Sequence, residues 1–243
     1  MWSIAIPSYQ RSAVLRNKTL PFLQRHQVPA SAIRVYVAGE EEARVYRETL
    51  LPDTYGEIVV GRLGITAQRN FISQTYPLDA WVVCMDDDID DLLVLDGGRL
   101  TPMIDFKSFV DIAFTSCVEN SRHLWGIYPV VNAMFMKPTT TTDMRFCIGQ
   151  CFGYINQRMR LNAPIKTDYE LTMAYSALDG GVVRFNWVVA KSRMGAAGGI
   201  GMARADRVGL NEQAIELFQR MYPDYFVVKR NKPGEILLKR QPP

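Results

Sequence analysis

The chain has 243 residues, 48% of them hydrophobic and 22% charged, and its formal net charge is +3 with two histidines. This length is enough for one large α/β domain with its own core. The small excess of basic residues does not by itself indicate a nucleic-acid-binding protein.

Four cysteines show neither a disulfide framework nor the spacing of a zinc site. Ser8 and Arg11 interrupt the first apolar run, which is not the pattern of a signal peptide. No segment reaches the roughly 18 apolar residues of a membrane span. We therefore expect a cytoplasmic protein with no membrane contact, and no obligate protein partner is evident.

The first ninety residues alternate strand and helix patterns. Apolar runs predict strands at 2–7, 33–38, 57–60 and 80–85, and amphipathic patterns predict helices at 41–50 and 64–76. Parallel strands need crossover connections of this kind, so the pattern indicates a mostly parallel sheet covered on both faces.

The rest of the chain is less regular. Helices are predicted at 105–120, 168–178 and 211–221, and strands at 125–131, 145–155 and 182–190, with two short strands around 232–234. The segment 194–202 is rich in glycine (Gly195, Gly198, Gly199 and Gly201), which predicts a mobile loop.

Three aspartates, Asp86, Asp87 and Asp88, follow the strand predicted at 80–85. Ligands of open α/β sheets bind beyond the carboxyl ends of the strands, and residues two apart in extended backbone project to the same side. Adjacent carboxylates repel each other, and Mg²⁺ or Mn²⁺ would relieve this while keeping positions open for substrate phosphates. An acidic turn capping the next helix is the alternative. The position after an apolar strand favours the metal site.

Four motifs in order resemble those of the GT-A glycosyltransferases of the family-2-like group. Residues 4–11 resemble the first strand and loop, 64–70 the glycine-led helix ending in Arg-Asn, and 82–88 the strand ending in Asp-x-Asp. Residues 166–171 resemble the element that carries the catalytic base, with Thr167 in place of a glutamate. Compact length and the triple aspartate look most like the TET-associated glycosyltransferases of phages and bacteria, which sugar-modify hydroxymethylated pyrimidines in DNA.

The resemblance implies an α/β fold of GT-A type: a Rossmann-like, mostly parallel central sheet with flanking helices and a smaller acceptor-side subregion. We expect a single domain, 1–243. Residues 1–95 would form the nucleotide-sugar-binding half, and residues 96–243 the acceptor-binding half and C-terminal flap. The glycines of 194–202 would be a flap over the donor or an ordinary flexible loop.

The resemblance also implies roles for individual residues. The nucleotide end of the donor pocket would be lined by Pro7, Ser8, Tyr9 and Arg11. Glu40 or Glu41 would recognise the uracil, and Arg69 would face the donor diphosphate. Asp86 would lie near the ribose and the metal, Asp88 would bind the metal, and Asp168 would be the general base. Many GT-A enzymes add a late histidine ligand, but the last histidine here is His123, which leaves the third ligand open.

We expect a metal-dependent, inverting glycosyltransferase that uses a UDP-sugar and Mn²⁺ or Mg²⁺. Its expected acceptor is a hydroxymethylated pyrimidine in DNA, with Arg158, Arg160 and Lys166 either holding acceptor phosphates or merely exposed. Other interpretations remain: the same fold acting on a glycan, lipid or small molecule, a nucleotidyltransferase, or a non-catalytic GT-A-like domain that binds nucleic acid. Residues 7–11 lack the glycine-rich basic loop typical of nucleotidyltransferases.

Overall fold

The computed structural model of the protein describes residues 1–192 and 204–240. Its first part contains β1 (Trp2–Pro7), α1 (Ser12–Asn17), α2 (Thr19–Arg25), β2 (Ile33–Val37), α3 (Glu40–Thr49), β3 (Glu57–Val60), α4 (Ile65–Thr75) and β4 (Trp81–Met85). The second part contains β5 (Ile89–Asp96), β6 (Arg99–Pro102), α5 (Phe106–Glu119), β7 (Leu124–Tyr128), β8 (Thr140–Thr141), β9 (Cys151–Ile155), α6 (Thr167–Asp179), β10 (Val183–Ser192), α7 (Arg204–Met221), β11 (Phe226–Lys229) and β12 (Lys232–Leu238).

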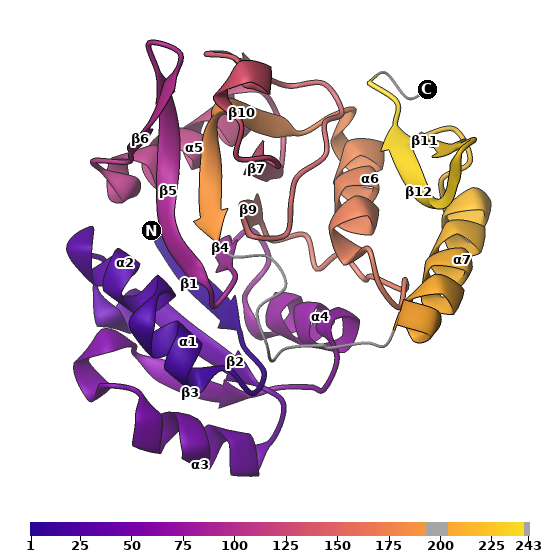
Figure 1. Ribbon diagram of the computed structural model, residues 1–243. Coiled ribbons are helices and arrows are strands. Elements are labelled where there is room, and N and C mark those ends of the chain that lie inside the picture. The colour runs from indigo at the N-terminus through magenta and orange to yellow at the C-terminus, as the bar shows by residue number, and fades with distance from the viewer. Residues whose placement is uncertain (193–203, 241–243) are drawn as a thin grey trace.

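One large sheet runs through the molecule in the order β3-β2-β1-β4-β9-β7-β10-β5-β6, and β8 pairs with β10 (Figure 1). The strands β3, β2, β1 and β4 are parallel to one another, as their connecting helices require. Beyond β4 the sheet becomes mixed, because β9 runs antiparallel to both β4 and β7. The predicted α/β class, with parallel strands in the first half, is confirmed.

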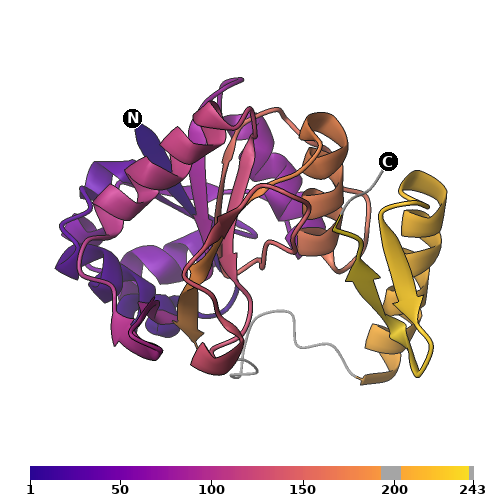
Figure 2. The same cartoon turned by 90° about the horizontal axis from the view of Figure 1, so that it is seen from above.

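Helices cover both faces of the sheet, as the apolar strands at its centre demand. Ile4, Ile6 and Val83 are fully buried in a cluster with side chains of α1, α2, α3 and α5 on one face. The other face packs on α4 and α6. On the far side of α6, α7 and the β11–β12 hairpin share a third core, which stands at the edge of the molecule (Figure 2).

The hairpin of β5 and β6 was not predicted. Its turn is Gly97–Gly98, both with positive φ (52° and 81°), which is the geometry of a two-residue hairpin turn. The sequence Asp-Gly-Gly-Arg at 96–99 carries that signal. In addition, the strand predicted at 145–155 begins only at Cys151.

Residues 145–150 form a loop in place of the first part of the strand predicted at 145–155. This loop lies against the end of β4, because the Gln150 carbonyl accepts a hydrogen bond from the Asp86 amide. The glycine-rich segment 194–202 lies outside the described residues. No helix in the described part of the chain has the length and apolar character needed to cross a membrane.

Candidate functional site

A cavity of about 590 Å³ opens at the carboxyl ends of the parallel strands. It is lined by Pro7, Ser8, Tyr9, Gln10 and Arg11 after β1, Ala38 after β2, Arg62, Leu63, Gly64 and Ile65 around the start of α4, Gln68 of α4, and Asp86 and Asp87 after β4. The strands β2 and β4 lie on opposite sides of β1, so the connections diverge there. Such a switch point is where open α/β sheets bind ligands, and the volume suits a small molecule.

The loop after β1 is held by a buried hydrogen-bond network. Ser8 Oγ donates to Asp87 Oδ2 at 2.6 Å and lies 2.6 Å from the Tyr46 hydroxyl. Since the single Ser8 proton goes to Asp87, Tyr46 donates to Ser8. Burial raises the pKa of Tyr46 to about 12, so the phenol keeps that proton. The Tyr46 oxygen also accepts from the Arg11 amide.

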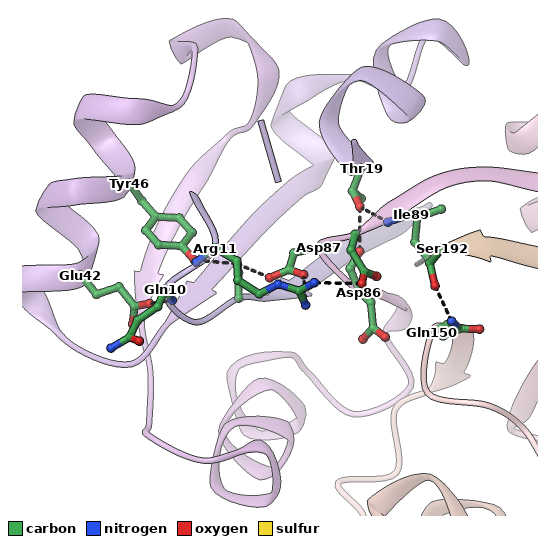
Figure 3. Close-up of polar contacts among 12 residues, drawn as sticks. Gln10, Arg11, Thr19, Glu42, Tyr46, Asp86, Asp87, Ile89, Gln150 and Ser192 are labelled. Atoms are coloured by element: carbon green, nitrogen blue, oxygen red, sulfur yellow. Dashed lines mark hydrogen bonds and ion pairs between the residues drawn. The ribbon is translucent and has the colours of Figure 1, made fainter. Parts of the chain in front are cut away.

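Glu42 joins the loops that follow β1 and β2. Its carboxylate accepts from the Gln10 amide at 2.5 Å (Figure 3) and from the Ala38 amide at 2.9 Å. Gln10 has a φ of 54°, so this contact fixes a left-handed residue at the cavity wall. The predicted base-recognising residues lie differently: Glu40 and Glu41 are exposed.

Glu41 forms an ion pair with Arg44 on the outside of α3 at 2.7 Å. It also lines a second cavity of about 570 Å³ that shares Tyr9, Gln10, Ala38 and Leu63 with the first. Sequence patterns single out no member of the run 40–42, because any first-turn glutamate satisfies the helix dipole. Only the hydrogen bonds to the Gln10 and Ala38 amides distinguish Glu42 from its two neighbours.

Gln68 forms the opposite wall and was not predicted either. Its side-chain oxygen accepts from the Arg62 amide at 2.6 Å, and its side-chain nitrogen donates to the Val37 carbonyl at 3.2 Å. Only 5% of Gln68 is exposed. A buried amide on an amphipathic helix needs hydrogen-bond partners, and this one ties α4 to the ends of β2 and β3.

Arg11 binds two of the three aspartates. Its Nη1 lies 2.9 Å from Asp87 Oδ1, and its Nη2 lies 3.0 Å from Asp88 Oδ2. Both carboxylates are buried. Burial raises the pKa of Asp87 to about 6, against the opposing effects of Ser8 and Arg11. Asp88, the expected metal ligand, is therefore engaged by a guanidinium.

Asp86 is different, because its carboxylate has no hydrogen-bond or ion-pair partner among the residues described. Its backbone is fixed instead: the amide donates to the Gln150 carbonyl, and the carbonyl accepts from Thr19 Oγ1. Burial raises the pKa of Asp86 to about 7, Arg69 opposes that rise, and Asp88, Asp87 and Asp168 add to it. Asp86 is thus the free carboxylate of the cavity wall.

Arg69 is not among the residues that line the cavity, and its expected contact with a diphosphate stays a prediction. Its Nη1 donates to Thr167 Oγ1 at 2.6 Å, and its guanidinium lies 5.4 Å from the centre of the Phe152 ring. A Cβ at position 149 would come within 2.5 Å of Nη2, so Gly149 leaves room for this arginine. Arg69 therefore connects α4 with the N-terminus of α6.

Asp168, the expected base, lies in the first turn of α6 and is half-buried. Its Oδ1 accepts only from the following amide, that of Tyr169. The charge of Asp168 adds to the rise in the pKa of Asp86. Glu170, one half-turn on, is fully buried and accepts from the amides of Asn162 and Ala163, which is a structural role.

A divalent cation fits this site only in part. Over residues 1–192 and 204–240, no three side chains of the metal-ligating types gather. Asp86 offers a carboxylate with no side-chain or backbone partner among the described residues, and Asp88 offers its Oδ1, since Arg11 contacts its Oδ2. Mg²⁺ is commonly held by one or two carboxylates together with substrate phosphates. The residues thus fit a cation that arrives with a diphosphate rather than a preformed protein site.

The basic residues before Asp168 lie in two settings. Arg158 and Arg160 are exposed, whereas Lys166 is half-buried with its ammonium 5.5 Å from the centre of the Tyr169 ring. Phe146 stacks on that ring at 4.2 Å. An aromatic pair with a cation therefore lies beside the expected base.

Solved structures with this arrangement of elements include glycosyltransferases. A TarS fragment from S. aureus, solved with UDP-GlcNAc, has a TM-score of 0.56 at 13% identity, and the match covers 89% of this chain and 66% of that one. The mannosyltransferase PcManGT from Pyrobaculum calidifontis, solved with GDP-Man and Mn²⁺, has a TM-score of 0.53 at 12% identity over 91% of this chain and 64% of that one.

This chain therefore spans slightly less than two thirds of each of those two chains. No family model matches the sequence, and no curated protein matches it. At such low identity the structural likeness establishes the fold, and the expected GT-A fold is confirmed.

Proposed function

We propose that this chain is a glycosyltransferase that moves a sugar from a nucleotide-sugar donor, a UDP-sugar, to a hydroxyl acceptor. One observation carries the proposal: the wall of the cavity at the β1–β4 switch point contains a carboxylate, Asp86, that has no partner among the described residues. A second carboxylate, Asp168, comes from the first turn of α6, in the second half of the chain. The GT-A fold supports the same function, since TarS was solved with UDP-GlcNAc and PcManGT with GDP-Man.

The donor would bind along the cavity. Its nucleoside would lie against the loops after β1 and β2, which Glu42 and Tyr46 hold in place. Its diphosphate would lie near Asp86 and the exposed Arg62. A bound Mn²⁺ or Mg²⁺ would neutralise charge on the departing diphosphate, with Asp86 and Asp88 as the carboxylates in reach.

Asp168 would act as the general base. It has no ion-pair partner among the described residues, so its carboxylate is available to a proton. As the acceptor oxygen forms its bond to the sugar carbon, the bond from that carbon to the phosphate oxygen breaks, and the hydroxyl proton passes to Asp168. Attack opposite the leaving diphosphate would invert the sugar carbon.

The acceptor we favour is a hydroxymethylated pyrimidine in DNA. Support comes from the sequence resemblance to the TET-associated enzymes and from Arg158, Arg160 and Lys166, which precede Asp168 in the chain. Exposed arginines suit acceptor phosphates. A base in a duplex would have to be flipped out to reach Asp168.

An apolar acceptor, such as a lipid-linked one, is the second candidate. The loop after β7 exposes four large apolar side chains, Val130, Val131, Met134 and Phe135. Its strand ends on the same edge of the sheet as β4, because both run antiparallel to β9. Exposed apolar groups of this kind suit a lipid surface.

The test is incubation of the protein and Mn²⁺ with a panel of UDP- and GDP-sugars and 5-hydroxymethylcytosine DNA, with Asp168→Asn as the matched control. Nucleoside mass spectrometry should show a hexose adduct made by the wild type alone. Donor hydrolysis without a DNA product would discard the DNA acceptor and keep the transferase. A protein that neither binds nor cleaves any nucleotide sugar would discard the whole proposal.

A further inference from the structure

Arg11 forms ion pairs with both Asp87 and Asp88. We propose that Arg11 is a built-in cation of the donor site. It neutralises Asp87 and Asp88 in the free protein and keeps a divalent metal from binding there until a diphosphate arrives with it. The inference rests on the proposed function for the identity of the diphosphate, but metal binding by the free protein tests it without any transfer.

The geometry is that of a strong, shielded interaction. Two different guanidinium nitrogens reach two different carboxylates, at 2.9 Å and 3.0 Å (Figure 3). The exposed fractions of the three side chains are 14%, 5% and 10%, so water screens the charges little. A charge-assisted contact of this kind is stronger than one at the surface.

A purely structural ion pair is the competing explanation, and two observations count against it. Arg11 lies in the wall of the cavity together with Asp86 and Asp87, so a ligand can reach it. Its Nε is buried and has no hydrogen-bond partner among the described residues. A purely structural arginine would be expected to have its buried donors satisfied.

The balance of charges explains why metal and diphosphate should bind together. Arg11 cancels part of the negative charge of the aspartates, and its own charge repels a second cation. Among the three aspartates, Asp86 alone then lacks an arginine partner among the described residues, and one such carboxylate holds Mg²⁺ or Mn²⁺ weakly. A diphosphate supplies further oxygen ligands for the metal and a new anionic partner for Arg11.

The experiment measures Mn²⁺ binding by the spin-resonance signal of free Mn²⁺, with and without UDP, and the loss of signal that UDP alone causes by binding Mn²⁺ is subtracted. Without UDP, Arg11→Met should bind Mn²⁺ at least about tenfold more tightly than the wild type, which is about 1.4 kcal/mol. Arg16→Met is the matched control, since it removes an exposed cation from α1, close in sequence to Arg11 but outside the cavity, and Arg16 has no carboxylate partner among the described residues. It should bind Mn²⁺ as the wild type does.

Arg11→Lys keeps the charge and should bind Mn²⁺ as weakly as the wild type does. Arg11→Gln serves in place of Arg11→Met if that variant does not fold. Wild-type binding should tighten markedly when UDP is added. The proposal is overturned if Arg11→Met, or Arg11→Gln in its place, gains no Mn²⁺ affinity. It is equally overturned if the wild type binds Mn²⁺ as tightly without UDP as with it.

Discussion

The two halves of the central sheet differ in the direction and the order of their strands. The strands β3, β2, β1 and β4 are parallel, and the loops after them form the cavity in which we propose that the donor binds, called the donor cavity below. The strands β9, β7, β10, β5 and β6 form a mixed region whose order does not follow the chain. Local pattern decides the first arrangement, whereas contacts between distant segments decide the second. Substitutions on the proposed acceptor side should therefore leave donor binding unchanged, and substitutions on the proposed donor side should leave the acceptor side unchanged.

The largest effect should come from the acceptor side. Asp168→Asn keeps the size of the side chain and removes the proton acceptor, so transfer should fall by roughly 10²–10⁴-fold. Donor affinity should stay at its wild-type value, because Asp168 does not line the donor cavity and its carboxylate bonds only to the Tyr169 amide. Steady-state rates and donor titration measure the two quantities separately.

Glu170→Gln is the control in the same helical turn. This carboxylate accepts from two backbone amides and is fully buried, so its loss should lower the free energy of unfolding by about 1–3 kcal/mol. Chemical denaturation of the variant and the wild type measures this difference in the free energy of unfolding. Equal loss of activity in the two variants at equal stability would remove Asp168 from the role of base.

A smaller effect is expected where the two halves meet. Arg69→Met removes the hydrogen bond between α4 and Thr167, a link across 98 positions of sequence. Misplacing Asp168 by about 1 Å should cost roughly 10²-fold in transfer. Thr167→Val removes the same hydrogen bond from the other end and should reproduce the fall in kcat. A fall in donor affinity that exceeds the fall in kcat would instead put Arg69 beside the diphosphate.

The next smaller effect is expected on donor binding alone. Glu42→Gln leaves one of the two amides, Gln10 or Ala38, without its acceptor, so the donor KM should rise about tenfold while kcat changes little. Glu41→Gln, on the exposed face of the same turn, should leave the donor KM unchanged. If the Glu41 variant loses donor affinity and the Glu42 variant does not, the expected base-recognising residue stands and Glu42 does not matter.

The smallest effect concerns the DNA acceptor. Charge reversal at Arg158 or Arg160 should flatten the dependence of log affinity on log salt by about one unit for each phosphate that the side chain binds in the wild type. Binding measured from low to high salt on hydroxymethylated DNA gives the slope. An unchanged slope in both variants would mean that these exposed arginines touch no phosphate.

The sequence predicted much of the donor half, because apolar strands and helices there follow local periodicity. It also predicted a donor pocket with Pro7, Ser8, Tyr9 and Arg11 at its nucleotide end and Asp86 near the ribose, and the structure brings these five residues together in one cavity wall. It could not show that Arg11 would pair with Asp87 and Asp88, since the partners lie 77 positions apart in the case of Asp88. Asp-x-Asp spacing is the same whether a metal or a guanidinium lies between the carboxylates.

Glu42, Tyr46 and Gln68 were missed for a related reason. Each acts through a contact with a backbone or hydroxyl group of another segment, and no local pattern distinguishes it from a surface or core residue. Position 68 carries a weak signal, because a glutamine on the apolar face of a helix needs a buried partner. The β5–β6 turn carried a stronger one, the glycine pair at 97–98.

The central claim is that the cavity around Asp86 binds a nucleotide sugar independently of the acceptor side. Calorimetric titration of UDP-sugar in the presence of Mn²⁺ tests it directly, on the wild type, Asp86→Asn and Asp168→Asn. We predict that Asp86→Asn loses at least about tenfold in donor affinity while Asp168→Asn binds as the wild type does. A wild type that binds no nucleotide sugar, or an Asp86→Asn variant that binds it normally, would contradict the account.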